Sequence, residues 1–376
     1  MNTDSKPLTI IEHFNDLVDP RIKDRCDHKL IDIIFIAVCA VISGADGCTD
    51  MEEFGIAKET WLRQFLELPN GIPSHDTFNR VLARLDPKEF QRCFLNWVQA
   101  LAQISDGELV AIDGKVLRRS HNRRAEQAAI NLVSAWARSN RLTLAQVKVA
   151  ETSNEITAVP ELLRLLCLKG CIVTVDALNC QKEIATEIRA QGADYVLALK
   201  GNHGHLHEDV VNFFRAVREE RTLNYEISRH REVDGEHGRI ETRQYWQVNL
   251  PGHLRGSNEW QDLQSLAMVE ATREVNGKVS CEQRYYLSSL AVDGRRIAEA
   301  IRGHWGIENS CHWILDVVFR EDDSRVRVGY AAENLALIRR AALSLLAQDK
   351  TVKRGIKTKR LKAALDEGYL LKILTT

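Results

Sequence analysis

The sequence predicts an α/β protein in which a helical amino-terminal domain precedes a mixed sheet, and three observations support this. Apolar residues in the first 105 positions recur with helical spacing. From Leu109 onward, short apolar runs of β-forming residues alternate with helical segments. Between about residues 225 and 290, strand-like runs follow one another without helices, which indicates a β-rich insertion.

Residues 1–105 are expected to form the helical domain. Residues 30–42 are almost all apolar, which predicts a buried core helix because a membrane span needs about 20 such residues. A short helix begins at Ser74, a good N-cap residue, and ends at Asp86-Pro87. This helix and its successor either form a DNA-reading helix-turn-helix or belong to a helical cap or dimerisation domain.

Residues 106–348 are expected to form the sheet domain, and 349–376 a basic carboxy-terminal tail. Helices are predicted over 158–168 and 182–191 and again from Ile297. Asn276-Gly277 predicts a hairpin turn inside the insertion. The predicted strands cover 109–113, 131–137, 142–149, 171–176, 195–199, 244–250, 266–273 and 284–290.

The charge is unevenly distributed although the formal net charge is only −1. Residues 1–108 carry a net −7 and 150–324 a net −8, whereas 109–149 carry +6 and 325–376 carry +8. Seven of the thirteen residues in 350–362 are basic. Two separate basic blocks indicate a polyanionic partner that is held at defined places.

The cysteine content and the amino terminus indicate a protein of the cytoplasm without a membrane partner. Nine cysteines are an odd number and none forms a C-x-x-C pair, which argues against a disulfide framework or a structural zinc site. The first fourteen residues are polar and lack the apolar core of a signal peptide.

Asp113 and Asp176 share one sequence environment, because each is the first charged residue after an apolar run of β-formers. Each is therefore expected at the carboxyl end of a buried strand, where ligands of open α/β sheets gather. If the two strands are neighbours, the carboxylates converge and invite a divalent cation. The alternative is that each aspartate caps the turn that follows it.

Glu308 is the third candidate ligand. On one helix through 301–319, it would lie with His312 at the centre of a stripe of large apolar residues. A carboxylate buried in such a stripe needs a partner or a metal. Pairing with His312, or with an arginine such as Arg118, is the alternative.

Three segments together resemble bacterial insertion-sequence transposases of the DDE type, and within them the H-repeat-associated group. They are AIDGKVLRRS (111–120), VTVDALN (173–179) and GHWGIENSCHWILDVVF (303–319). The resemblance covers nearly the whole chain and implies a ribonuclease H-like core with a β-rich insertion between the second aspartate and the glutamate. The spacing agrees, since the interval from Asp176 to Glu308 is much longer than that from Asp113 to Asp176 and can hold the insertion.

The resemblance implies that Asp113, Asp176 and Glu308 bind Mg²⁺, with Mn²⁺ as a substitute, and cut and rejoin double-stranded DNA at insertion-sequence ends and target sites. A homodimer is a further expectation. A structure-selective nuclease on the same core and a catalytically silent DNA-binding remnant are the alternative functions. For phosphoryl transfer, a pair of metal ions activates the attacking oxygen and stabilises the leaving one.

One departure affects the predicted DNA contacts. Related enzymes have a tyrosine seven residues before the glutamate, an arginine four before and a lysine seven after, where this chain has Ile301, His304 and Leu315. Its group uses His304-Trp305 and Asn309 instead. The predicted DNA contacts are Lys115, Arg118, Arg119, Arg123, Arg124, Lys200, His304, Asn309, His312 and the segment 350–362.

Overall fold

The computed structural model describes residues 9–22, 26–101, 106–121, 128–150, 154–219, 225–236, 239–252 and 254–375. Arg123 and Arg124 lie outside these ranges. The chain divides into two compact units, the first comprising Met1–Gln103, Gly114–Thr152 and Glu308–Thr376, and the second comprising Ile104–Asp113 and Ser153–Ile307. The predicted functional domains (1–105, 106–348 and 349–376) stay predictions.

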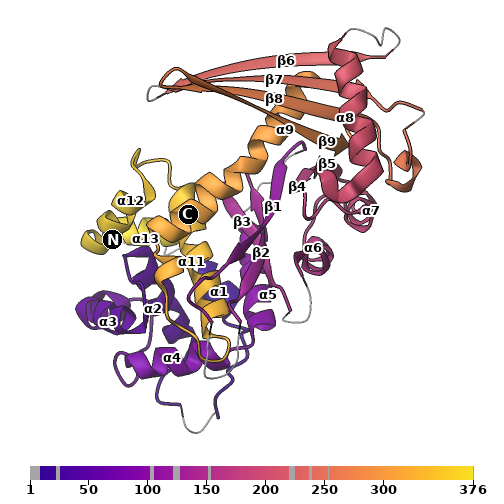
Figure 1. Ribbon diagram of the computed structural model, residues 1–376. Helices are drawn as coiled ribbons and strands as arrows, with labels where there is room; N and C mark the ends of the chain where they lie inside the picture. The colour runs from indigo at the N-terminus through magenta and orange to yellow at the C-terminus, as the bar shows by residue number, and fades with distance from the viewer. Residues whose placement is uncertain are drawn as a thin grey trace. The chain divides into compact units, whose positions relative to one another are not determined.

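The first unit is mostly helical, as predicted for the amino-terminal region. Residues 33–42 of α2 are buried, which confirms the predicted core helix. The long helix α11 packs against both α2 and α4 (Figure 1). The helices are α1 (Thr9–Phe14), α2 (Leu30–Ile42), α3 (Cys48–Leu62), α4 (His75–Arg84), α5 (Pro87–Leu101), α10 (Trp313–Val317), α11 (Ala331–Gln348), α12 (Ile356–Leu365) and α13 (Glu367–Leu374).

Helix α4 begins where its sequence indicates. The Ser74 hydroxyl accepts a hydrogen bond from the Thr77 backbone N–H at 3.4 Å, which confirms the predicted N-cap. Phe78, Val81 and Leu82 are buried on one side of the helix, while its other side is exposed. Helix α4 is therefore a surface helix with a polar face that is open to a partner.

The strands of the first unit form a hairpin that was predicted almost to the residue. Strands β2 (Asn131–Ala137) and β3 (Leu142–Lys148) pair antiparallel. Helices α5 and α11 pack against β3. In the order of hydrogen bonding, this unit holds β3, β2 and the end of β1 (Leu109–Val116), whose earlier residues, through Asp113, belong to the second unit.

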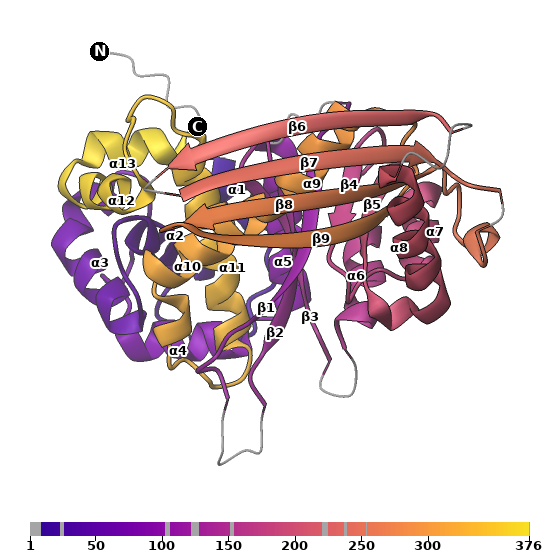
Figure 2. The same ribbon diagram turned by 45° about the horizontal axis from the view of Figure 1, so that its top comes forward.

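The second unit is built on a mixed sheet, in agreement with the predicted fold class. Its strand order is β1-β4-β5-β9-β8-β7-β6, parallel among the first three strands and antiparallel thereafter. The predicted β-rich insertion extends the sheet, because its strand β9 pairs directly with β5 (Figure 2). The strands after β1 are β4 (Ile172–Val175), β5 (Asp194–Leu199), β6 (Ile227–Glu236), β7 (Arg239–Asn249), β8 (Ser265–Val275) and β9 (Lys278–Ser288).

Helices cover both faces of this sheet. Tyr285 of β9 has ring contacts with His207 and Phe214 of α8, whereas Tyr286 belongs to a core cluster with Ile297 and Ala300 of α9. Successive strand residues point to opposite faces, so α8 and α9 lie on opposite sides of β9. The helices are α6 (Glu155–Arg164), α7 (Lys182–Ala190), α8 (Gly204–Arg218) and α9 (Gly294–Ile307).

The basic segment 350–362 is only partly a surface feature. Lys359 donates to the Leu346 backbone oxygen at 2.9 Å, and Arg360 donates to the Val41 backbone oxygen at 3.0 and 3.1 Å. Arg360 also stacks its guanidinium 4.2 Å from the centre of the Phe319 ring. Both basic side chains are buried and bonded within the protein, and the contact of the segment 350–362 with phosphates stays a prediction.

Asp349 joins α11 to the last two helices, and Asp349→Asn is expected to lower the free energy of unfolding at neutral pH by roughly 2 kcal/mol. Burial alone would raise the pKa of Asp349. Hydrogen bonds from Thr351, Tyr369 and Val352 outweigh it and lower the pKa from 3.8 to about 2. Because the folded state has the lower pKa, this stabilisation is present above about pH 4 and disappears as the pH falls to about 2. Urea unfolding of parent and variant from pH 7 to pH 2 tests it: a difference that does not shrink with acid would contradict this origin.

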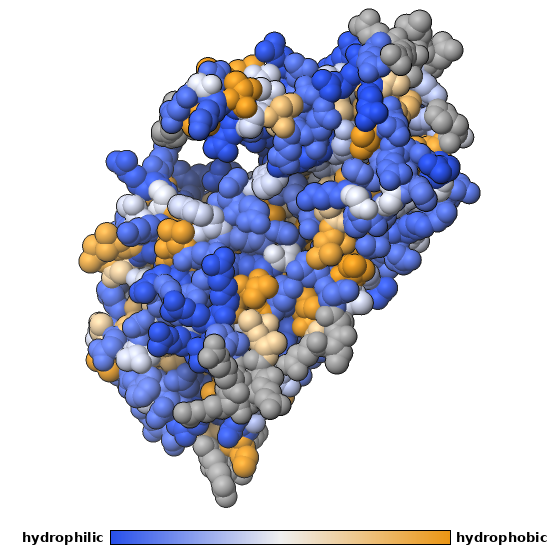
Figure 3. All heavy atoms as spheres, in the orientation of Figure 1, coloured by the Kyte–Doolittle hydropathy of each residue, from blue (hydrophilic) through white to orange (hydrophobic). Residues whose placement is uncertain are grey.

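Within the described residues, no helix is long and apolar enough to cross a membrane. The face drawn in Figure 3 is largely hydrophilic, with its apolar residues in small separate groups.

Candidate active site

Asp113 and Asp176 occupy matching positions on neighbouring parallel strands. The pairing of β1 with β4 runs from Leu109↔Ile172 to Ile112↔Val175, and each aspartate is the next residue. Residues two apart share a face of a strand, so Asp113 lies on the face of Ala111 and Asp176 on that of Thr174, which are themselves partners. The register therefore brings the two residues to one edge and one face. Strand β1 itself continues to Val116, beyond its predicted end.

Asp176 also caps the turn that follows it, as the alternative interpretation held. Its Oδ1 accepts hydrogen bonds from the backbone N–H of Asn179 at 3.0 Å and from the Asn179 side-chain amide at 2.9 Å. Asn179 is fully buried, which holds the carboxylate in place. No hydrogen bond reaches Oδ2 from any residue that the structure describes, so capping occupies one of the two oxygens.

Helix α9 is attached to the sheet beside these aspartates. His304 Nδ1 and Thr174 Oγ1 lie 3.0 Å apart in a hydrogen bond, and α9 packs against β4. Thr174 precedes Asp176 by two residues on the same face of the strand. His304, which was predicted to contact DNA, therefore has a partner within the sheet.

Glu308 directly follows α9, one helical turn after His304, and begins a π-helical segment, Glu308–His312. The predicted apolar stripe is wrong at two positions, because Trp305 is 41% exposed and the Glu308 side chain 53% exposed. A π-helical turn holds an extra residue, so the 3.6-residue spacing assumed for 301–319 does not continue through it. Glu308 is consequently on the surface, where a ligand can reach it.

Of the two side chains predicted to pair with Glu308, His312 lies near it and Arg118 pairs with another residue. His312 Nδ1 lies 4.0 Å from Glu308 Oε2, at the outer limit of an ion pair, while Arg118 pairs with Asp322 at 3.1 Å. Asn309 is exposed. His312 is only 4% exposed, and its contact with DNA stays a prediction.

Lys115, another predicted phosphate contact, is buried in a network of carboxylates. Its Nζ lies 2.6 Å from Asp316, 3.2 Å from Asp322 and 3.6 Å from Glu321. Burial alone would lower the pKa of Lys115, but the three carboxylates outweigh it and raise the pKa above its ordinary value. Lys115 is thus a charged residue with carboxylate partners inside the protein, and its contact with DNA stays a prediction.

The remaining predicted DNA contacts are accessible. The Arg118 side chain is 79% exposed, and that of Arg119 is 48% exposed with Asp323 at 3.5 Å. Lys200 follows β5 and is exposed. Binding of DNA by these three residues stays a prediction.

Comparison with known proteins decides the family. Residues 104–345 match the family model described as "Transposase DDE domain", and residues 11–98 match the one described as "DDE_Tnp_1-associated". The chain belongs to the DDE transposase family. The resemblance that the three sequence segments carried is confirmed.

Relatives of this DDE family member align over nearly their whole length. "Putative transposase YncI" of Escherichia coli O157:H7 is 41% identical, over 98% of this chain and 95% of that protein. "H repeat-associated putative transposase YhhI" of E. coli K12 is 40% identical, over 97% of each. "Inactive transposase YbfQ" of E. coli K12 is 43% identical over only 75 residues, which are 20% of this chain.

Two residues that hold His304 and Asp176 in place, Thr174 and Asn179, were not predicted, although the sequence contains a signal for each. Thr174 stands two positions before Asp176 in an apolar strand, where a hydroxyl on the same face is unusual. Asn179 stands three positions after it, the spacing of an aspartate that caps its own turn. His304 could not be matched to Thr174, because that contact depends on how α9 packs on the sheet.

Proposed function

We propose that this protein catalyses Mg²⁺-dependent cleavage and strand transfer of double-stranded DNA at insertion-sequence ends. Asp113, Asp176 and Glu308 would hold the metal. The observation that carries the proposal is the register of the neighbouring parallel strands β1 and β4, because it places two aspartates of separate motifs directly after the last paired residues, Ile112 and Val175.

The donor chemistry fits a hard divalent cation. All three residues offer carboxylate oxygens, which Mg²⁺ and Mn²⁺ prefer. When bound, such ions lower the pKa of the attacking oxygen and stabilise the charge on the leaving oxygen. The family assignment supports a divalent metal, since it is a DDE domain that residues 104–345 match.

The protein's own residues would set the geometry. Asn179 fixes one oxygen of Asp176 and leaves the other to a ligand. The Thr174–His304 hydrogen bond anchors α9 one turn before Glu308. We infer that this anchor fixes the end of α9, which Glu308 directly follows, and that Glu308 is the third carboxylate ligand.

The test is a nicking assay on duplexes that carry the ends of the element, with Mg²⁺ and with Mn²⁺, followed by a strand-transfer assay. Nicking and transfer support the proposal, whereas nicking without transfer would assign the nuclease alternative. A full-length preparation that binds DNA but never nicks it would favour the silent remnant. The silent remnant has to be tested because one relative, which aligns over 75 residues, is named an inactive transposase. This chain, in contrast, aligns with a longer relative over 98% of its residues.

Thr174→Val is expected to lower the cleavage rate and to raise the half-saturating Mn²⁺ concentration about tenfold, because it removes the hydrogen bond to His304 and keeps the shape of the side chain. DNA affinity should not change. Thr186→Val is the matched control, since the Thr186 hydroxyl donates only to the Lys182 backbone oxygen on the exposed side of α7. An unchanged Mn²⁺ dependence in Thr174→Val would contradict the anchoring role.

A further inference from the structure

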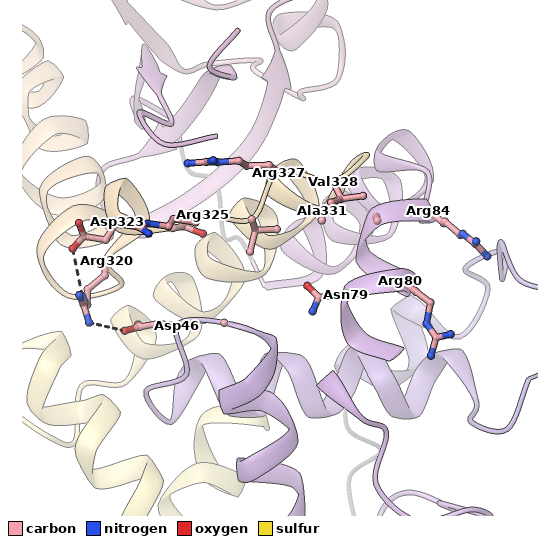
Figure 4. A pocket seen from close by; sticks show the side chains of 14 residues that line it. Asp46, Asn79, Arg80, Arg84, Arg320, Asp323, Arg325, Arg327, Val328 and Ala331 are labelled. Carbon is pink, nitrogen blue, oxygen red and sulfur yellow. Dashed lines mark hydrogen bonds and ion pairs between the residues drawn. The ribbon is translucent and has the colours of Figure 1, made fainter. Parts of the chain in front are cut away.

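The first unit contains a groove of about 850 Å³ between α4 and the segment 320–331 (Figure 4). Its walls come from opposite ends of the sequence, which no local motif connects. Five arginines line it against two carboxylates, Asp46 and Asp323. The arginines are Arg80, Arg84, Arg320, Arg325 and Arg327.

The two walls are held together by hydrogen bonds to the end of α4. The Tyr330 backbone N–H donates to the Ala83 backbone oxygen at 3.1 Å. The Asn334 side-chain amide donates to the backbone oxygens of Leu82 and Leu85 at 2.9 Å each. Gly329 has a φ of +53°, and a Cβ there would stand 2.3 Å from the Ala83 oxygen, so the close approach requires glycine. The groove is therefore preformed.

Both carboxylates of the groove form ion pairs with arginines, and Arg320 pairs with both of them. Arg320 lies 3.6 Å from Asp46 and 3.4 Å from Asp323, which also pairs with Arg119. Of the other arginines, Arg80 and Arg327 make hydrogen bonds to backbone oxygens, at 3.2 and 2.8 Å, and form no ion pair within the described ranges.

Arg84 and Arg325 are exposed and have no ion pair with any residue that the structure describes. Figure 4 shows Arg80 and Arg84 extending from α4, on the side of the groove opposite Arg320. A preformed groove in which four guanidinium groups have no carboxylate partner among the described residues attracts anions.

We propose that this groove binds the phosphate backbone of DNA, with Arg84 and Arg325 as phosphate contacts on its two walls. This inference rests on the proposed function, which makes DNA the substrate. Guanidinium groups bind phosphates through paired N–H donors, and their spread over two separate elements suits an extended polyanion better than one small ion. The exposed face of α4 also carries Asn79, a residue type that reads adenine edges.

The net charges of the sequence segments do not reveal this surface. Arg80 and Arg84 lie in the segment 1–108, whose net charge is −7, and only folding places them beside Arg325 and Arg327 from the basic block 325–376. Of the two interpretations of α4 and its successor, a DNA-reading helix-turn-helix or a helical cap or dimerisation domain, DNA binding in the groove would agree with the first.

The experiment measures equilibrium binding of the full chain to a labelled mixed-sequence duplex of about 30 base pairs, over a range of salt concentrations, because backbone contacts are independent of sequence. The double variant R84A/R325A is expected to lower the slope of log K against log salt by about 1.8, and the affinity at 0.1 M salt roughly fiftyfold. The double variant R92A/R296A removes the same charge from exposed arginines outside the groove and should bind nearly like the parent.

The inference would be overturned if R84A/R325A bound DNA with the affinity and salt slope of the parent. It would also be overturned if R92A/R296A lost as much affinity as R84A/R325A, because that would indicate a general effect of charge. Displacement of the duplex by millimolar inorganic phosphate at constant ionic strength would assign the groove to a small anion instead. The proposed function is judged separately by nicking. A parent that nicks DNA while R84A/R325A binds normally refutes only the groove, and binding that depends on Arg84 and Arg325 without any nicking refutes only the enzyme.

Discussion

Asp113→Ala, Asp176→Ala and Glu308→Ala are each expected to abolish Mg²⁺-dependent cleavage and to leave DNA binding nearly intact. Metal coordination contributes several kcal/mol to the transition state, so the loss of one ligand should lower the cleavage rate by about a thousandfold or more. Affinity depends mainly on arginines and lysines at phosphates. Removing a carboxylate should therefore leave it unchanged or raise it slightly, because repulsion is relieved.

The control for these variants is Asp316→Asn. Asp316 follows Glu308 by eight residues, pairs with Lys115 at 2.6 Å, and is an alternative carboxylate for the third ligand. Nicking with Mg²⁺ and with Mn²⁺ is measured beside binding on the same preparations. Cleavage by Glu308→Ala at the parental rate, together with its loss in Asp316→Asn, would show that the third ligand is wrongly assigned.

Much of the fold could be predicted because its signals are local. The apolar run that became α2, the Ser74 cap and the Asn276-Gly277 turn each depend on a few neighbouring residues. The position of Asp113 and Asp176 directly after apolar runs of β-formers could be predicted for the same reason, whereas their convergence was predicted only on the condition that β1 and β4 are neighbours. Strand β6 was missed, because its sequence alternates charged residues with few apolar ones and it pairs only with β7 among the described strands.

The parts that could not be predicted depend on distant partners. Lys115 looked like a phosphate contact within its motif, yet its carboxylate partners belong to the segment 316–322, far along the chain. Arg360 belongs to a strongly basic segment and is nevertheless buried against α2. The exposure of Glu308 depends on a π-helical turn, which periodicity does not reveal. Charge alone therefore did not distinguish structural basic residues from those open to a ligand.

Arg340→Met is expected to lower the free energy of unfolding by roughly 3–5 kcal/mol, because it removes the partner of a buried carboxylate. Arg340 Nη1 lies 3.0 Å from Glu321 Oε1, and neither side chain is exposed. Burial would raise the pKa of Glu321, but Arg340 and Lys115 outweigh that effect and lower it. Without Arg340, Glu321 keeps only Lys115, at 3.6 Å, as an ion-pair partner among the described residues.

Two comparisons identify the uncompensated charge as the cause. The double variant R340M/E321M should be more stable than R340M alone, because it removes the buried carboxylate as well. The deficit of R340M relative to the parent should shrink as the pH falls, since a Glu321 that has lost Arg340 takes up a proton more readily and the protonated form carries no charge penalty. Urea unfolding followed by circular dichroism measures both effects. Arg92→Met is an exposed control and is expected to be nearly as stable as the parent. If R340M/E321M is less stable than R340M and the deficit is independent of pH, the loss comes from packing around Arg340 and the ion pair is not its source.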